Sequence, residues 1–411
     1  MSSLAVRRTL AIVALLYVVE GLPLALFRDL LPVWLLRHGV SIEAVGALSG
    51  LSLAWSLKFL WSPLVDRYGT YGRWIFAALV AMGALLFLFS ASDAAGLGAL
   101  LVVAIGAFCA ASATQDVAID AYTIRLVERG HEGAANAVRI SAYRVALILG
   151  GGGMLLLPSW IGWPATLRVA GAMLLAFAGL VVALTAGHDR SRPRRADASQ
   201  IPFIDALRPW AARPKLRAVI FFVLLYRLAD QAMGPMVKPF WVARGLSNEQ
   251  IGLVSVTFGA LATMAGGAAG GLFVERRGIP SGLLVLGVLA LLSNLGYAAA
   301  AFWPESGRFG VYAASVVDSF CAGLAAAAFM AFLMRICDRE HAAVQYACLT
   351  ALYALPGWLA GMVSGWAVAH TSYAAWFVLT AAFGLPALLA LPAARAWAEA
   401  AGGEVGEGET R

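Results

Sequence analysis

The chain consists of long apolar runs that recur along its whole length, each close to the roughly 20 residues with which a helix crosses a bilayer. Twelve runs can be read, at 9–27, 41–63, 74–92, 96–121, 134–157, 162–186, 217–241, 249–273, 280–303, 308–334, 342–369 and 372–396. Of 411 residues, 61% are hydrophobic and only 13% are charged, a balance that no soluble domain has. The sequence therefore predicts an all-α integral membrane protein with 12 transmembrane helices.

The positive charges predict how these helices are oriented. Lys and Arg total 30, and with the N-terminus in the cytoplasm 20 of them lie on that side and six outside. The opposite orientation would violate the positive-inside rule. We therefore expect an inner-membrane protein with both termini in the cytoplasm, and an uncleaved first helix after Arg7 and Arg8. The net charge of +7 reflects this topology, so no nucleic-acid partner is expected.

The chain repeats itself. The first run is followed by "LPVWLLRHGVSIEAVG" and the seventh by "KPFWVARGLSNEQIG"; the second ends in "SPLVDRYG" and the eighth in "GLFVERRG". These matches predict two pseudo-symmetric six-helix halves, with a transport site near the middle of the membrane. We expect halves at 1–187 and 217–398, a basic cytoplasmic linker at 188–216 and a cytoplasmic tail at 399–411.

The loop matches resemble the G-x-x-x-D-R-x-G-R motif of the major facilitator superfamily. That resemblance implies the superfamily's fold and a latch between the cytoplasmic ends of the halves, made here by Asp66, Arg67, Gly69, Arg73, Glu275, Arg276 and Gly278. Small residues predict close helix contacts in four runs. These are Gly46 and Gly50, Gly150 to Gly153, Gly267 and Gly271, and Gly357, Gly361 and Gly365.

Charges inside apolar runs are the strongest functional signal, because they are costly in lipid. In "SATQDVAIDAY", Asp116 and Asp120 are one turn apart and share a helix face. Arg144 and Arg139, on the next run, lie at matching depths. We expect a functional pair of Asp116 with Arg144, a structural ion pair of Asp120 with Arg139, and Lys58 close by.

Carboxylates near the middle of a span are candidates for proton coupling, because a moving counter-charge makes such a group take and release a proton. The candidates are Glu20, Asp116, Asp230 and Asp318. Side chains that could line a substrate cavity are Tyr17, Lys58, Tyr143, Arg144, Tyr226, Arg227 and Tyr353.

A narrower resemblance runs through the first eleven spans. "LKFLWSPLVDRYG", "SATQDVAIDAY", "LYRLADQAMG" and the stretch 318–352 resemble the AmpG-type muropeptide permeases, a branch that includes acetyl-coenzyme A carriers and siderophore permeases. The resemblance implies proton-driven import of an anhydro-muropeptide. It maps the branch's functional positions onto Gln115 with Asp116, Tyr226 with Arg227 and Asp230, and Gln345 with Tyr346. Asp318 stands where the branch carries Glu-Asn.

The alternative is siderophore uptake, because siderophore permeases of the branch are as short as this chain. An exporter is less favoured, because the glycines of the fifth run lack the G-P-x-x-G-G ending typical of drug antiporters. A receptor or a membrane enzyme is less favoured, because no catalytic constellation is visible. The five histidines form no metal cluster and the four cysteines no C-x-x-C pair, so no metal or cofactor is expected. We expect a monomer whose partners are a small solute, protons and lipid.

Overall fold

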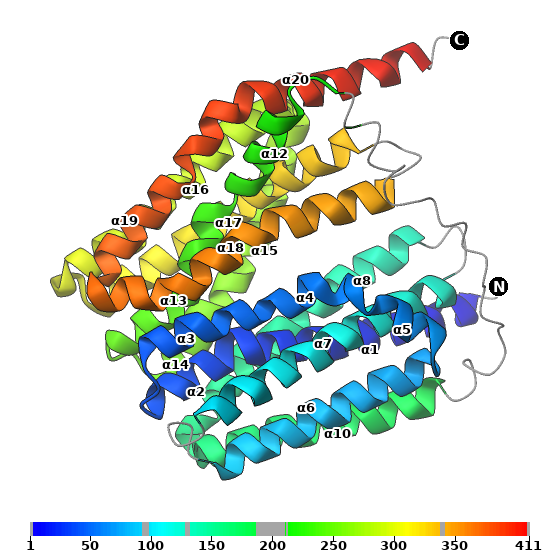
Figure 1. The fold of residues 1–411 in the computed structure, drawn as a ribbon, viewed down its shortest axis with the longest axis vertical. Helices are drawn as coiled ribbons and strands as arrows, with labels where there is room; N and C mark the ends of the chain where they lie inside the picture. The colour runs from blue at the N-terminus through cyan, green and yellow to red at the C-terminus, as the bar shows by residue number, and fades with distance from the viewer. Residues whose placement is uncertain are drawn as a thin grey trace. The chain divides into compact units, whose positions relative to one another are not determined.

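The computed structural model describes residues 3–92, 98–127, 132–185, 210, 213–337 and 342–408, and these contain helices but no strand (Figure 1). Nine helices are long and apolar enough to cross a membrane, and Ile42–Leu57 and Ser141–Leu156 are shorter apolar helices. The seventh expected segment is broken into α12 (Leu216–Leu225) and α13 (Leu228–Ala243). Together these account for the twelve predicted segments and confirm the all-α membrane class.

The chain forms two compact units. Unit 1 comprises residues 1–194 with 241–257, and unit 2 comprises 195–240 with 258–411. Residues 241–257 thus belong to the first unit, although the sequence predicts that they lie in the second half of the protein. Most of the expected linker lies outside the described residues, and α20 (Leu385–Gly408) continues as a helix into the expected tail.

Unit 1 is built around α1, which packs on α7 and α8. Its elements in chain order are α1 (Ser3–Ala25), η1 (Leu26–Leu30), α2 (Leu31–Arg37), α3 (Ile42–Ser49), η2 (Gly50–Ser52), α4 (Leu53–Leu57), η3 (Lys58–Leu60), α5 (Ser62–Arg67), α6 (Tyr71–Ala91), α7 (Ala99–Leu126), α8 (Glu132–Leu147), η5 (Ile148–Gly153), α9 (Met154–Leu156), α10 (Pro158–Thr185), α14 (Asn248–Gln250) and η6 (Ile251–Phe258). Helices α6 and α10 lie side by side (Figure 1). Gly83 permits this approach, because a Cβ there would lie 3.1 Å from the carbonyl oxygen of Gly171.

Unit 2 has its core between α12, α16, α17 and α20. Its remaining elements are α15 (Gly259–Arg277), α16 (Ile279–Phe302), η7 (Pro304–Ser306), α17 (Gly307–Ile336), α18 (Ala342–His370) and α19 (Tyr373–Phe383). Aromatic rings fill the centre: Phe222 lies 5.4 Å from Phe332, and Tyr226 stacks on Phe329 at 5.1 Å between ring centroids. Burial of such large rings stabilises the packing of these helices.

The residues that match between the two repeats have the same local roles. Gly39 and Gly245 both have positive φ, 79° and 74°, which favours glycine. Two residues later, the hydroxyl of Ser41 accepts from the backbone of Ala44, and that of Ser247 accepts from the backbone of Gln250. Each serine therefore caps the helix that follows, so the repeat reflects shared turn and cap chemistry.

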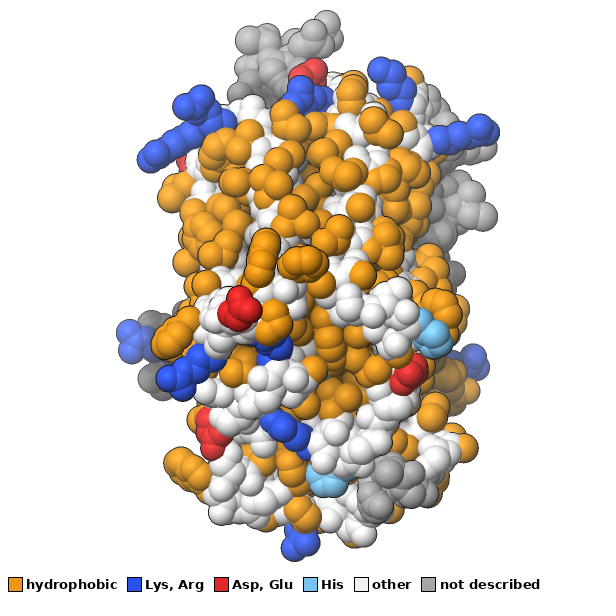
Figure 2. All heavy atoms as spheres, turned by 90° about the vertical axis from the view of Figure 1, so that its left-hand side faces the viewer, with side chains coloured by type: hydrophobic (Ala, Val, Ile, Leu, Met, Phe, Trp, Pro, Cys, Tyr) orange, Lys and Arg blue, Asp and Glu red, His pale blue; other side chains and the backbone are white. Residues whose placement is uncertain are grey.

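Hydrophobic side chains cover most of the upper half of the face drawn in Figure 2, and polar and charged groups are frequent in its lower half. Individual large apolar residues on the long helices are strongly exposed, among them Val103 at 66%, Leu359 at 59% and Leu389 at 83%. Exposure on this scale is costly in water but not in lipid. The exposed apolar surface agrees with a multi-pass membrane protein.

Candidate functional site

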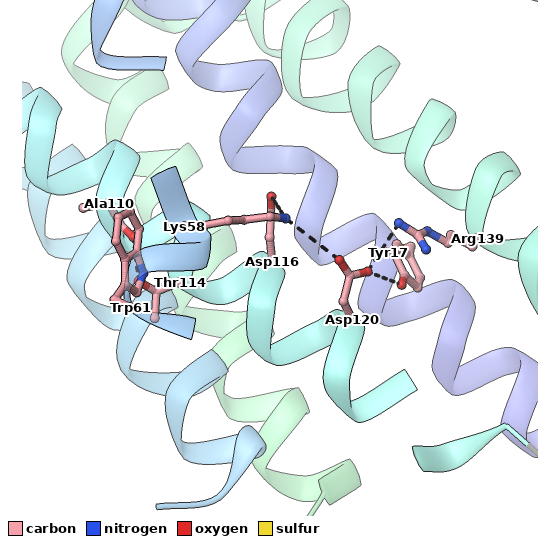
Figure 3. A network of polar contacts seen from close by, with 8 residues as sticks. All are labelled: Tyr17, Lys58, Trp61, Ala110, Thr114, Asp116, Asp120 and Arg139. Carbon is pink, nitrogen blue, oxygen red and sulfur yellow. Dashed lines mark hydrogen bonds and ion pairs between the residues drawn. The ribbon is translucent and has the colours of Figure 1, made fainter. Parts of the chain in front are cut away.

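The main polar network lies inside unit 1 (Figure 3). Lys58 Nζ is 3.7 Å from Asp116 Oδ2 and 3.9 Å from Asp120 Oδ2. Arg139 Nη2 is 3.3 Å from Asp120 Oδ1, and the hydroxyl of Tyr17 donates to the same oxygen at 2.7 Å. The guanidinium of Arg139 also lies 4.7 Å from the centroid of the Tyr17 ring. Asp120 thus holds α1, α7 and α8 together.

Lys58 reaches the network because its segment departs from regular helix. It begins the 3₁₀ helix η3, which leads through Trp61 into α5, where Pro63 occupies the first turn. Proline has no N–H to continue a preceding helix, so the break is expected here. The indole of Trp61 donates to Thr114 Oγ1 at 3.1 Å, which ties this segment to α7 beside Asp116.

Among the described residues, the ion pair of Asp116 is with Lys58 and not with Arg144. Arg139 and Arg144 are five residues apart, which is about 140° around a helix. Both therefore cannot face α7, whereas Asp116 and Asp120 are only about 40° apart. The expected contact of Asp120 with Arg139 is present, although Arg139 is about half exposed.

Glu20 and Gln115 are buried polar side chains of unit 1. Gln115 is fully buried and its amide donates to the backbone oxygen of Val19 at 2.9 Å, while its Oε1 has no partner among the described residues. Glu20 is 7% exposed, and its Oε2 likewise has no hydrogen-bond partner among them. Tyr143 lies beside the turn of α1 that carries Glu20. A Cβ placed on Gly21 would be 3.2 Å from the Tyr143 ring.

A second polar group lies in unit 2 at the break between α12 and α13. Arg227 Nη2 is 3.2 Å from Asp230 Oδ2, and Nη1 donates to the backbone oxygen of Ala322 at 2.8 Å. The hydroxyl of Tyr226 donates to the backbone of Leu283 at 2.9 Å, and the residue is 7% exposed. The structure therefore encloses Tyr226 in the core rather than leaving its ring open to a solute.

Asp318 is held by two neutral side chains that the sequence interpretation did not select. Ser293 Oγ donates to Asp318 Oδ1 at 3.2 Å. With its amide turned so that the nitrogen faces the carboxylate, buried Asn294 donates to the same oxygen at 3.1 Å. The polar pair Ser-Asn inside the apolar run 280–303 was the signal that could have found them.

The other candidates of unit 2 lie along α18. Gln345 is fully buried, and the hydroxyl of Tyr346 donates to the sulfur of Met330 at 3.3 Å. Gln231, another residue that was not selected, donates through Nε2 to the backbone oxygen of Tyr353 at 3.0 Å. Pro356 lies three residues farther along α18.

The expected latch residues lie at two helix ends. Gly69, with φ of 64°, follows α5, and Arg73 lies in the first turn of α6. Glu275 and Arg276 lie in the last turn of α15, before Gly278. Arg67 ends α5, but the side chain of Asp66 is outside the described residues, so the latch stays a prediction. Within the described ranges, no group of three His, Cys, Asp or Glu residues could hold a metal ion.

Comparisons with known proteins place these features in a family. A family model described as Major Facilitator Superfamily matches residues 13–303. The anhydromuropeptide permease of Escherichia coli (strain K12) is 30% identical over 93% of this chain and 78% of its own. Putative transporter AmpG 4 of Rickettsia felis is 26% identical over 92% and 94%.

Solved structures agree on the fold. A bacterial homolog of the human lysosomal transporter Spinster is similar with a TM-score of 0.70 and 14% identity, over 98% of both chains. The nucleoside transporter NupG is similar with a TM-score of 0.68 and 14% identity, over 97% of this chain and 99% of its own. At this identity the likeness shows the architecture alone.

Proposed function

We propose that this chain, which belongs to the Major Facilitator Superfamily, imports an anhydromuropeptide or a similar medium-sized polar solute across the bacterial inner membrane. It is a multi-pass membrane transporter of the AmpG type. The observation that carries the substrate proposal is the 30% identity to an anhydromuropeptide permease over 93% of this chain. The length of the chain does not favour another branch, because the Rickettsia felis relative named AmpG 4 is matched over 94% of its own length.

The polar residues inside the helices fit such a solute. An anhydromuropeptide presents hydroxyl, amide and carboxylate groups, and these pair with ammonium, guanidinium and carboxamide side chains. Lys58 in unit 1, and Arg227 and Gln231 in unit 2, offer such groups. We assign these residues to solute binding. We assign Tyr17 and Arg139 a structural role, because both contact Asp120.

We propose that the flow of protons supplies the energy for transport, because the buried carboxylates are groups that can carry a proton. Asp116, Asp120, Asp230 and Asp318 lie with Glu20 inside or at the ends of membrane helices, where a change of counter-charge changes their proton occupancy. We propose that the two repeats alternate access to the solute, with both termini in the cytoplasm as the positive charges indicate.

Uptake by the purified protein in proteoliposomes tests the substrate proposal. With an acidic exterior, labelled anhydromuropeptide should accumulate inside, and a ferric siderophore supplied under the same conditions should not. Empty liposomes are the control for leakage. Accumulation of the siderophore and exclusion of the muropeptide would establish the alternative, and hydrolysis of the muropeptide without uptake would establish an enzyme.

A further inference from the structure

The group formed by Glu20, Asp116, Asp120, Lys58 and Arg139 in unit 1 contains one carboxylate more than it has cations, while Arg28 and Arg144 lie at its edge and act on Tyr143. Three acidic side chains, those of Glu20, Asp116 and Asp120, share the region with Lys58 and Arg139. Both cations are engaged by the aspartates: Lys58 lies within 4 Å of Asp116 and Asp120, and Arg139 within 4 Å of Asp120. No ion pair among the described residues involves Glu20.

Glu20 is also the member that is least able to carry a charge. It is 7% exposed, and its Oε2 accepts no hydrogen bond among the described residues. An ionised carboxylate with no cation beside it, and with one oxygen buried without a donor, is strongly unfavourable in a membrane interior. Asp120, by contrast, is bound by Tyr17, Lys58 and Arg139.

The groups around Glu20 reinforce this difference. From α7 it is faced by Asp116 and Asp120, whose negative charges oppose its own, while Lys58 and Arg139 of η3 and α8 act in the opposite sense. The phenols of Tyr17, on the same helix, and Tyr143, on α8, also lie within electrostatic reach. If Glu20 is neutral, two carboxylates balance two cations.

We propose that Glu20 holds the coupling proton in this arrangement of unit 1, and that Lys58 stabilises its carboxylate when the proton leaves. This inference rests on the proposed proton-driven transport. The O–H bond of the carboxylic acid breaks, the proton passes to water, and the electron pair stays on Glu20. Lys58 can serve as the counter-charge because its contacts of 3.7 and 3.9 Å are longer than a strong charge-assisted hydrogen bond. Asp116 then positions Lys58 and does not carry the proton.

The transport test compares Glu20→Gln with wild type. The glutamine has the shape of the neutral acid but cannot release a proton, so uptake driven by a pH gradient should be lost while solute counterflow at equal pH is retained. Glu305→Gln is the matched control, because the same change is made on an exposed residue of η7. If Glu20→Gln still concentrates solute on a pH gradient, the assignment to Glu20 is wrong.

A second measurement needs no solute. In an Asp318→Asn background, which removes the other carboxylate held only by neutral side chains, infrared spectra at neutral pH should show the carbonyl band of a protonated carboxylic acid. This band should be absent when Glu20→Gln is added. The band should persist when Asp116→Asn or Asp120→Asn is introduced. These two variants test the assignment of the band even if Glu20→Gln does not fold. Loss of the band in Asp116→Asn would overturn the proposal. If wild type takes up no muropeptide but the band follows Glu20, the substrate proposal fails and the proton site stands.

Discussion

Lys58 is the cation shared by both aspartates of α7 (Figure 3). Replacing it by methionine removes the only ion-pair partner that the described residues give Asp116, so Lys58→Met should lower the free energy of unfolding by about 1–3 kcal/mol. Adding Asp116→Asn should restore part of that loss, because no charge is then left without a partner. Chemical unfolding of the single and double variants measures the coupling. Strictly additive effects would contradict the shared contact.

The two aspartates should differ in importance. Asp116 has 14% of its side chain exposed and Asp120 has 32%, and the partner Arg139 is 46% exposed. An exposed pair of this kind is worth only about 0–1 kcal/mol. Asp120→Asn should therefore retain most of the initial uptake rate, while Asp116→Asn, which releases Lys58 in the deeper region, should lose most of it. Thermal unfolding confirms that both variants are folded; equal rates would refute the distinction.

At this scale the sequence predicted which charged residues of unit 1 come together better than how they pair. The depth and spacing of Asp120 and Arg139 led to the observed contact. Arg144 was assigned by depth alone, and depth ignores the angle of about 140° around the helix that separates it from Arg139. The contacts of Lys58 depend on the 3₁₀ segment before Pro63, which no apolar periodicity records.

At the scale of elements, three π-helices meet in unit 1. Contacts join η1 to η5, and Gly152 of η5 approaches Gly252 of η6. A Cβ added to Gly252 would lie 2.6 Å from the backbone oxygen of Gly152 and 2.9 Å from Cβ of Leu155. Because π-helical turns are frequent at functional sites, this junction is a candidate for movement during transport.

Gly252→Ala tests that junction. The added methyl group should destabilise unit 1 by about 1–3 kcal/mol through overpacking and slow the uptake of solute. Gly267→Ala is the control, because nothing lies within 4 Å of a Cβ placed there. Thermal unfolding and initial uptake rates are the measurements. Equal behaviour of the two variants would show that the close approach does not matter.

The small residues of α15 show what sequence could not decide about an element. The stretch "AGGAAGG" holds two glycine stripes four residues apart, and Gly267 with Gly271 was expected to mark the close contact. In the structure, nothing lies within 4 Å of a Cβ placed on either residue, whereas a Cβ on Gly266 or Gly270 would meet the backbone of α17. Composition shows that a small face exists, but only the packing shows which stripe a neighbouring helix uses.

On the scale of the whole molecule, the fold class followed from the apolar runs, because only helices satisfy backbone groups in lipid over so many residues. The positions of the helix ends were predicted less well. The first helical span continues to Arg37, past Arg28 and Asp29, because a π-helix carries the chain through these charges. The sequence repeat did not predict that residues 241–257 belong to unit 1. The matching residues of the repeat form local turns and helix caps, and they carry no information on packing.

Orientation in the membrane is a property of the whole chain and can be tested directly. In a variant without its four cysteines, a cysteine at Arg276 should be labelled only from the cytoplasmic side and one at Arg308 only from outside. The excess of positive charge at the cytoplasmic ends is the reason. Labelling at Arg276 from outside would reverse the proposed topology.

The central claim is that a muropeptide and a proton cross the membrane together. The direct measurement is the external pH of a weakly buffered suspension of proteoliposomes when anhydromuropeptide is added. The account predicts that the medium becomes more alkaline as solute enters, and that Glu20→Gln abolishes this change while the Glu305→Gln control retains it. Entry of the solute into wild-type vesicles with no movement of protons would contradict the account.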